Sequence, residues 1–227
     1  MSVQSLFNYL LPFFGALLGM SIIFIMRPKK PLAFKLLLAF SGAFLLGVTV
    51  FHLMPEVFSI LNFQAGPWII GGLLFQIILE YASQGAEHGH AHSAKNSGLP
   101  WFLLSSLAIH AFIEGLPLTQ NSPLLWGIFI HKIPIGMVVF FLIWETPVST
   151  VTKSVTLTLF ALMTPLGSVF HDYFDLLQTL QLQITAIVIG MLLHIATTIL
   201  FESNKGHVFN LQKLLTIILA FGLSFFL

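Results

Sequence analysis

Three side chains of this sequence have the types and the spacing of a metal site. His110 and Glu114 lie four residues apart in the stretch HAFIEG, and His131 opens the stretch HKIPIG. Residues four apart on a helix project from the same face. Two imidazoles and one carboxylate suit Zn²⁺, Fe²⁺ or Mn²⁺, with positions left for water. The alternative is that both histidines only form hydrogen bonds between helices.

The segments around these residues are apolar enough to span a membrane. Of the 227 residues, 57% are hydrophobic and only 7% are charged, whereas a soluble domain carries about 25% charged residues. A spanning helix needs about 20 mostly apolar residues, so we expect an all-α membrane bundle of about eight transmembrane helices. It forms one domain over residues 1–227. The expected spans are 6–26, 36–61, 63–81, 99–118, 124–144, 155–174, 182–201 and 211–227.

The positive charges predict how these helices are oriented. Apart from Lys132, which lies inside a span, the lysine and arginine residues all fall in or beside alternate connections. Cytoplasmic connections carry an excess of Lys and Arg, so we expect both termini on the non-cytoplasmic side. Residues 83–98 then form a cytoplasmic loop. The other connections are short, which suits the inner membrane of a bacterium.

The expected helices bring the three ligands to a common depth. At a rise of about 1.5 Å per residue, His110 lies about 16 Å from the cytoplasmic face and Glu114 about 22 Å. His131 comes from the opposite face and lies about 18–20 Å from the cytoplasmic side of a core about 30 Å thick. The two helices are joined by a short connection, so they are antiparallel neighbours. The sequence therefore predicts a metal site near the middle of the membrane.

Other ionisable residues are expected toward the non-cytoplasmic ends of the spans. His52, Glu56, His171, Asp172 and Asp175 would form an acidic vestibule that attracts cations and partly dehydrates them. For the two aspartates, ordinary solvated charges are an equal alternative.

A second set of ionisable residues is expected in the cytoplasmic half. His194, inside a span, is either a further ligand on the path or a packed polar group. The run HGHAH in the cytoplasmic loop either receives or senses metal ions or binds nothing. The residues expected on the cytoplasmic side are Glu80, Glu87, His88, His90, His92, Glu202 and His207.

Lys132 is unusual because an ammonium inside a membrane needs a carboxylate partner. Glu114 and Glu56 are the candidates. We hypothesise that Lys132 takes the place of a second cation and keeps the site mononuclear.

These motifs resemble those of the ZIP (Zrt-/Irt-like) family of zinc and iron transporters. HLMPE at 52–56 is similar to the family's HLxPE, HAFIEG at 110–115 to HNxxEG, and HKIP at 131–134 to the opening of HExPHE. The stretch 190–210 also looks like bacterial members, so the likeness covers essentially the whole chain. The resemblance implies helices four and five enclosed by two inverted three-helix repeats, uptake toward the cytoplasm, and homodimers in many members. It also implies that His110, Glu114 and His131 are metal ligands.

The sequence departs from the family motifs at four positions. Ala111 and Lys132 stand where the motifs have ligands of a second site, so the resemblance implies that this chain lacks that site. Ile135 and Gly136 stand where the motif ends in histidine and glutamate, so one carboxylate of the main site is missing. The candidates to complete the shell are water, His194 and Glu56.

We therefore expect a transporter of divalent metal cations, of zinc before iron or manganese, and not an enzyme. The ion is cargo, and no cofactor is expected. The partners are the lipid bilayer and the ion; a net charge of +1 gives no argument for nucleic acid. The absence of cysteine excludes thiolate ligands. The alternative from another class is an intramembrane zinc hydrolase, in which three ligands hold a Zn²⁺ that activates water. A purely structural or sensory protein would leave the mid-membrane carboxylate unexplained.

Overall fold

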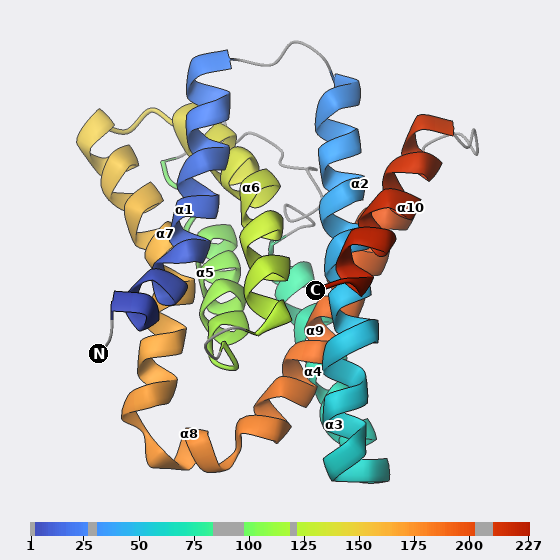
Figure 1. Cartoon of the computed structure of the whole chain (residues 1–227). Coiled ribbons are helices and arrows are strands. Elements are labelled where there is room, and N and C mark those ends of the chain that lie inside the picture. Colours follow the sequence, from blue (N-terminus) through green and yellow to red (C-terminus); the bar gives the residue numbers. More distant parts are fainter. Residues whose placement is uncertain (1–2, 27–30, 84–97, 119–121, 203–210) are drawn as a thin grey trace.

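The regular structure is helical throughout the part of the chain that the computed structural model describes, residues 3–26, 31–83, 98–118, 122–202 and 211–227 (Figure 1). Eight of these helices are at least 15 residues long. The prediction of an all-α fold is confirmed. The α-helices are α1 (Val3–Met26), α2 (Pro31–Val48), α3 (Met54–Leu61), α4 (Ala65–Ser83), α5 (Trp101–Gly115), α6 (Pro123–Trp144), α7 (Thr150–Tyr173), α8 (Asp175–Thr179), α9 (Gln181–Glu202) and α10 (Leu211–Phe225).

Four helical stretches are long and apolar enough to cross a membrane. They are Leu32–Ala82, Pro123–Trp144, Thr150–Tyr173 and Gln181–Phe201, and the helices Tyr9–Ile25, Trp101–Gly115 and Leu211–Phe225 are apolar but shorter. The first stretch has 51 residues, more than one span of about 20 residues needs. Asn62, with a φ of 50°, turns the chain between α3 and α4 within it. These lengths and compositions indicate an integral membrane protein.

Two local features were not expected from the sequence. The turn Thr49–Leu53 between α2 and α3 is a π-helix, a wider turn in which each hydrogen bond spans one more residue than in an α-helix. The short helix α8 lies between α7 and α9. In addition, α7 begins at Thr150 rather than at 155, because the Ser149 side chain caps it by accepting a hydrogen bond from the Thr152 N–H at 3.1 Å.

The helices pack in pairs: α1 on α6, α4 on α9, α2 on α10 and α5 on α7. Glycines bring the paired backbones together. A Cβ added to Gly72 of α4 would lie 1.9 Å from the Ile187 carbonyl oxygen of α9, and one added to Gly190 of α9 would lie 1.9 Å from the Ile69 oxygen. Small residues of this kind allow helices in lipid to approach closely, where dispersion contacts replace the hydrophobic effect.

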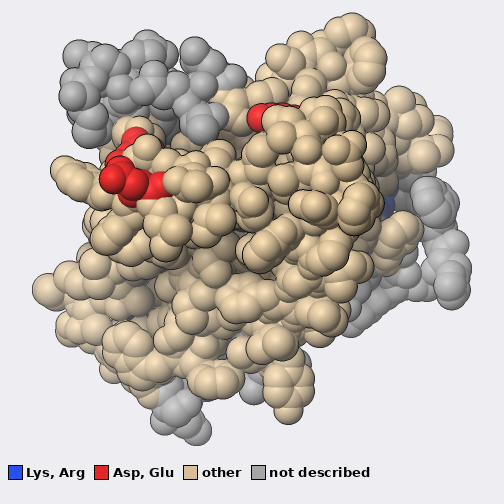
Figure 2. Space-filling model, turned by 90° about the horizontal axis from the view of Figure 1, so that it is seen from below, with Lys and Arg blue, Asp and Glu red and all other residues tan. Residues whose placement is uncertain are grey.

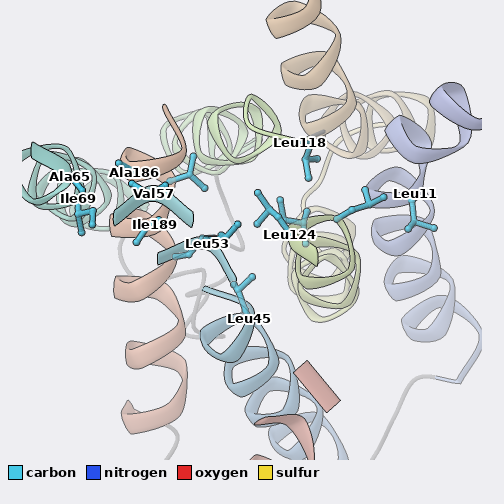
Figure 3. Packing of buried hydrophobic residues seen from close by; sticks show 14 residues of the cluster. Leu11, Leu45, Leu53, Val57, Ala65, Ile69, Leu118, Leu124, Ala186 and Ile189 are labelled. Carbon is cyan, nitrogen blue, oxygen red and sulfur yellow. The ribbon is translucent and has the colours of Figure 1, made fainter. Parts of the chain in front are cut away.

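An apolar cluster joins these pairs around α6. Leu45 of α2, Leu53 at the π-turn and Leu124 of α6 lie together with Ile189 of α9 (Figure 3). Most of α6 is buried, and it contacts α1, α2 and α7, whereas α5 contacts α4 and α7. The expectation that the two ligand-bearing helices are adjacent antiparallel neighbours is therefore not met: α5 and α6 are not among the packed pairs of the described helices, and α7 contacts both. α6 lies in the interior of the bundle, whereas α5 has an exposed side that carries Trp101, Phe102 and Ile109.

The two neighbouring glycines of α4 provide a test of this packing. Gly72→Ala should lower the free energy of unfolding by about 1–3 kcal/mol or more, because the new methyl group overlaps a backbone oxygen that has no rotamer to move into. Gly71→Ala should be neutral or slightly stabilising, because nothing lies within 4 Å of a Cβ at that position and alanine favours the helix. Thermal unfolding of the purified protein in detergent measures both. Equal effects of the two substitutions would contradict the pairing of α4 and α9.

Candidate metal centre

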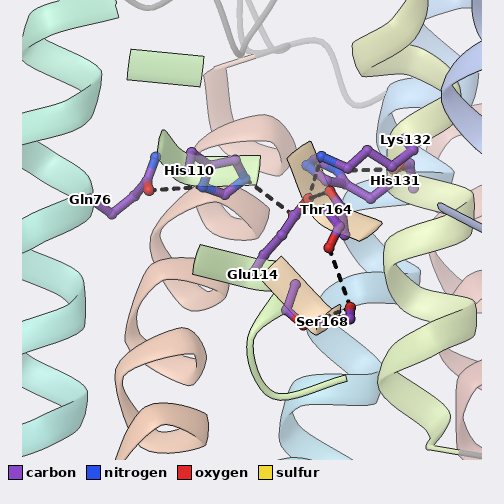
Figure 4. Close-up of polar contacts among 9 residues, drawn as sticks. Gln76, His110, Glu114, His131, Lys132, Thr164 and Ser168 are labelled. Carbon is purple, nitrogen blue, oxygen red and sulfur yellow. Dashed lines mark hydrogen bonds and ion pairs between the residues drawn. The ribbon is translucent and has the colours of Figure 1, made fainter. Parts of the chain in front are cut away.

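The three predicted ligands converge inside the bundle (Figure 4). His110 and Glu114 come from α5 and His131 comes from α6, and one potential ligand atom of each lies within 4.8 Å of those of the other two. All three side chains are buried, with exposed fractions of 4%, 0% and 1%. The predicted convergence is confirmed: this is a buried group that could hold a metal ion.

The end of α5 fixes the position of Glu114. Gly115 is the last residue of the helix, and a Cβ there would lie 2.2 Å from the Thr164 carbonyl oxygen of α7. Only glycine permits this approach. The Gly115 carbonyl oxygen accepts a hydrogen bond of 2.9 Å from the Ser168 hydroxyl and one of 3.2 Å from the Leu118 N–H just beyond the helix. The contact between α5 and α7 therefore places Thr164 next to the carboxylate.

His110 is oriented by a side chain from a third helix. Its Nδ1 lies 3.1 Å from Oε1 of Gln76 in α4, and its Nε2 lies 3.3 Å from Oε2 of Glu114. Figure 4 joins Nδ1 to the amide oxygen of Gln76, which is able to accept a proton from the ring when Nδ1 is the protonated nitrogen. In that tautomer the lone pair of the neutral ring is on Nε2, the nitrogen that faces Glu114. Outer partners of this kind commonly orient histidines that bind metal.

His131 has a comparable partner on α2. Its Nδ1 lies 3.4 Å from Oγ of Ser41, and its ring is 6.4 Å from the His110 ring at an interplanar angle of 82°. Pro134, one turn further along α6, has no N–H to donate to the Ile130 carbonyl, so the helix is loosened beside the histidine. The two imidazoles thus approach the carboxylate from different helices.

The two oxygens of Glu114 have different partners. Oε1 accepts a hydrogen bond of 3.0 Å from the Thr164 hydroxyl and forms an ion pair with the buried ammonium of Lys132. Oε2 faces His110. Of the two partners expected for Lys132, Glu114 is the one found; Glu56 lies exposed on α3. One oxygen of the carboxylate therefore remains for an ion.

The other predicted residues lie outside this group. His194 of α9 contacts the Glu80 carboxylate of α4 through Nε2, and both side chains are about one-fifth exposed. His52 bonds through Nε2 to the Ser224 carbonyl oxygen of α10 at 2.8 Å. Of the residues proposed to complete the shell, neither His194 nor Glu56 belongs to the group that converges on the site in the described part of the chain.

The helices α3 and α8, which carry Glu56 and Asp175 of the residues expected at a vestibule, lie at the same end of the molecule (Figure 1). His171 is buried with its Nδ1 3.3 Å from Oδ1 of Asp172, and the Tyr9 hydroxyl of α1 bonds to Oδ2 of the same carboxylate. Asp175 is exposed. Seen from this end, small acidic areas lie in an otherwise mostly uncharged surface (Figure 2).

Several predicted positions fall outside the described residues or have no described side chain. They are Glu87, His88, His90, His92, Glu202 and His207.

Sequence reasoning missed the partners of the three ligands. Gln76, Ser41 and Thr164 are uncharged polar residues in three different helices, and each is fully or almost fully buried. An uncharged amide in the middle of a span is costly without a partner, so Gln76 carried a usable signal. Serine and threonine bond readily to their own helix backbone, so Ser41 and Thr164 did not stand out.

Comparison with known proteins adds no relative. No protein-family model matches the chain, and a search of curated proteins gives no match. Function is therefore inferred from the geometry of the buried group.

The contact between Gln76 and His110 can be tested by metal binding. Gln76→Ala should raise the Kd for Zn²⁺ about 10–100-fold, because the His110 ring loses the acceptor that fixes its tautomer and orientation. Gln76→Glu should retain affinity, since a carboxylate also accepts the Nδ1 proton. Equilibrium titration of the purified protein gives the Kd. The matched control is Gln64→Ala at an exposed position between α3 and α4; an unchanged Kd in Gln76→Ala would contradict the role of the amide.

Proposed function

We propose that this protein transports a divalent transition-metal ion across the membrane, with Zn²⁺ as the preferred ion and Fe²⁺ or Mn²⁺ as the alternatives. The observation that carries the proposal is the buried group of His110, Glu114 and His131 inside apolar helices. Ionisable side chains in a membrane are expensive and usually mark a site or a path. Two imidazoles and one carboxylate match the ligand preferences of these ions.

The incomplete ligand set favours transport over permanent binding. Three side chains, one of which offers a single oxygen, leave coordination positions for water. An ion held in this way can be released, as conduction requires. Further polar pairs lie on either side of the group along the bundle: His171 with Asp172 near the end that carries α8, and Glu80 with His194 between α4 and α9.

An intramembrane hydrolase is less well supported. Such an enzyme needs a general base within hydrogen-bond reach of the metal-bound water. Glu114 is the single carboxylate of the group within the described residues, and its Oε1 is already bound by Lys132 and Thr164. That leaves Oε2 as ligand or as base, but not as both.

The helix pairing supports a bundle of about eight spans with two inverted repeats, as in the ZIP family. A two-fold exchange of helices relates the two halves: it swaps α1 with α7, α2 with α9, α4 with α10 and α5 with α6. This exchange converts the α1–α6 contact into the α7–α5 contact. The same exchange converts the α4–α9 contact into the α10–α2 contact, whereas the contacts of α2 with α6 and of α4 with α5 have no such counterpart among the described helices. The repeats would then be α1 to α4 and α7 to α10, with α5 and α6 between them. Homodimerisation, which the family resemblance implies, is part of the same proposal.

We place the connection between α6 and α7 at the cytoplasmic face of a bacterial inner membrane. Lys153 donates a hydrogen bond of 2.8 Å to the Trp144 carbonyl oxygen, and its ammonium lies 5.5 Å from the Trp144 ring centroid. A lysine and a tryptophan together are typical of a membrane interface, and the positive charge favours the cytoplasmic side. The end with α3 and α8, and both termini, would lie outside.

Uptake into proteoliposomes tests the proposal. His131→Ala and Glu114→Gln should each reduce Zn²⁺ flux at least about 10-fold, because each removes one of three ligands from a water-poor site. Gln64→Ala should leave the flux unchanged. Flux is measured with a zinc-sensitive dye inside the vesicles.

Two results would contradict transport. One is flux that does not differ between the wild type and both ligand variants. The other is Zn²⁺-dependent hydrolysis of a lipid or an amide without any flux, which would favour the enzyme instead.

A further inference from the structure

Lys132 shares the carboxylate that an ion in the site would need. Its ammonium forms an ion pair with Oε1 of Glu114, and both side chains are buried, with exposed fractions of 4% and 0%. Thr164 donates to the same oxygen. A carboxylate and an ammonium that are both removed from water stabilise one another and leave little net charge between them. The site is therefore close to neutral before an ion arrives.

The surroundings hold the ammonium in this position. Its Nζ lies 5.6 Å from the centroid of the Phe160 ring of α7, where the ring face attracts a cation. On the α1 side, Gly15 lies against the side chain: a Cβ added there would be 3.2 Å from Cβ of Lys132. The same Cβ would lie 2.6 Å from the Phe129 carbonyl oxygen, so glycine is needed for this close approach of α1 to α6. The lysine is thus packed between two helices and directed at Glu114.

This neutralisation changes which cations the site can hold. Mg²⁺ and Ca²⁺ bind through several oxygen ligands, among which carboxylates supply the negative charge. Here the single carboxylate of the described group is neutralised and offers one oxygen. Imidazole lone pairs, by contrast, bind Zn²⁺ and its neighbours in the transition series without a formal charge.

We propose that Lys132 is a specificity-determining residue: it neutralises Glu114 so that the site selects ions that imidazoles bind, excludes hard cations, and holds the selected ion weakly enough to release it. This rests on the proposed function of the same site. The site gains selectivity but binds every divalent ion more weakly, because the ammonium repels each ion that enters.

A purely structural ion pair would behave differently. If Lys132 served only to hold α5, α6 and α7 together, its loss would loosen the ligands and weaken the binding of every ion. If it acts as proposed, its loss strengthens binding and broadens the choice of ion. The sign of the change in Kd therefore distinguishes the two roles.

The experiment is equilibrium binding of Zn²⁺ and Mg²⁺ to the full chain in detergent. Lys132→Met should lower the Kd for Zn²⁺ about 10-fold or more, since a positive charge beside the ion is removed from a region of low dielectric constant. Mg²⁺ should compete measurably with Zn²⁺ in this variant and not in the wild type. Lys132→Arg, which keeps the charge, is the matched control, and its Kd and selectivity should lie closer to those of the wild type than those of Lys132→Met do. Lys132→Gln, which keeps a hydrogen-bond donor without the charge, should behave like Lys132→Met.

The possible outcomes separate this inference from the proposed function. An unchanged or higher Kd for Zn²⁺ in folded Lys132→Gln or Lys132→Met would overturn it, as would Mg²⁺ competition equal to that in the wild type. If Lys132→Met fails to fold, the Kd of Lys132→Gln for Zn²⁺ decides between the two roles. If the wild type binds Zn²⁺ but shows no flux in vesicles, transport is contradicted. The Kd values of the Lys132 variants then still decide whether Lys132 sets the specificity of binding. A wild type that binds no Zn²⁺ would overturn both.

Discussion

The structure depends on the cost of placing the Glu114 carboxylate inside an apolar bundle. A buried charge without partners is strongly unfavourable, so the helices around it must supply partners. Lys132 supplies the opposite charge, Thr164 supplies a hydroxyl, and His110 lies within 3.3 Å of the second oxygen. These groups come from α5, α6 and α7. The need to compensate the buried charge of Glu114 therefore also determines how these three helices pack against one another.

Close backbone packing makes this arrangement attainable. Gly115 of α5 and Gly167 of α7 each place a backbone where a Cβ would lie 2.1–2.2 Å from a carbonyl oxygen of the other helix. The short hydroxyl of Thr164 can then reach Glu114. Helices in lipid gain little from the hydrophobic effect when they associate, so contacts of this kind and the polar pairs between helices must provide much of the specificity. A stable bundle and a polar centre are thus two consequences of the same packing.

The convergence of the three ligands was predictable from the sequence, whereas the residues that orient them and the π-turn were not. The four-residue spacing of His110 and Glu114, the rise of a helix and the positions of the loop charges predicted convergence with His131 correctly, although α5 and α6 are not a packed pair. The cost of a buried ammonium limited the partners of Lys132 to Glu114 and Glu56, of which Glu114 is the one found. Gln76 and Ser41 come from helices whose rotation about their axes depends on contacts far apart in the sequence. The π-turn at Thr49–Leu53 depends on such contacts as well, and the uniformly apolar helices carry no strong pattern that would reveal them.

The central claim is that two imidazoles and one carboxylate oxygen bind a single metal ion inside the bundle. X-ray absorption spectroscopy of the Zn²⁺-loaded protein in lipid observes that ligand shell directly. It should show two imidazoles among nitrogen and oxygen ligands at about 2.0–2.2 Å, and one imidazole fewer in His131→Ala. A shell of oxygen ligands alone, or a spectrum that His131→Ala leaves unchanged, would contradict the account.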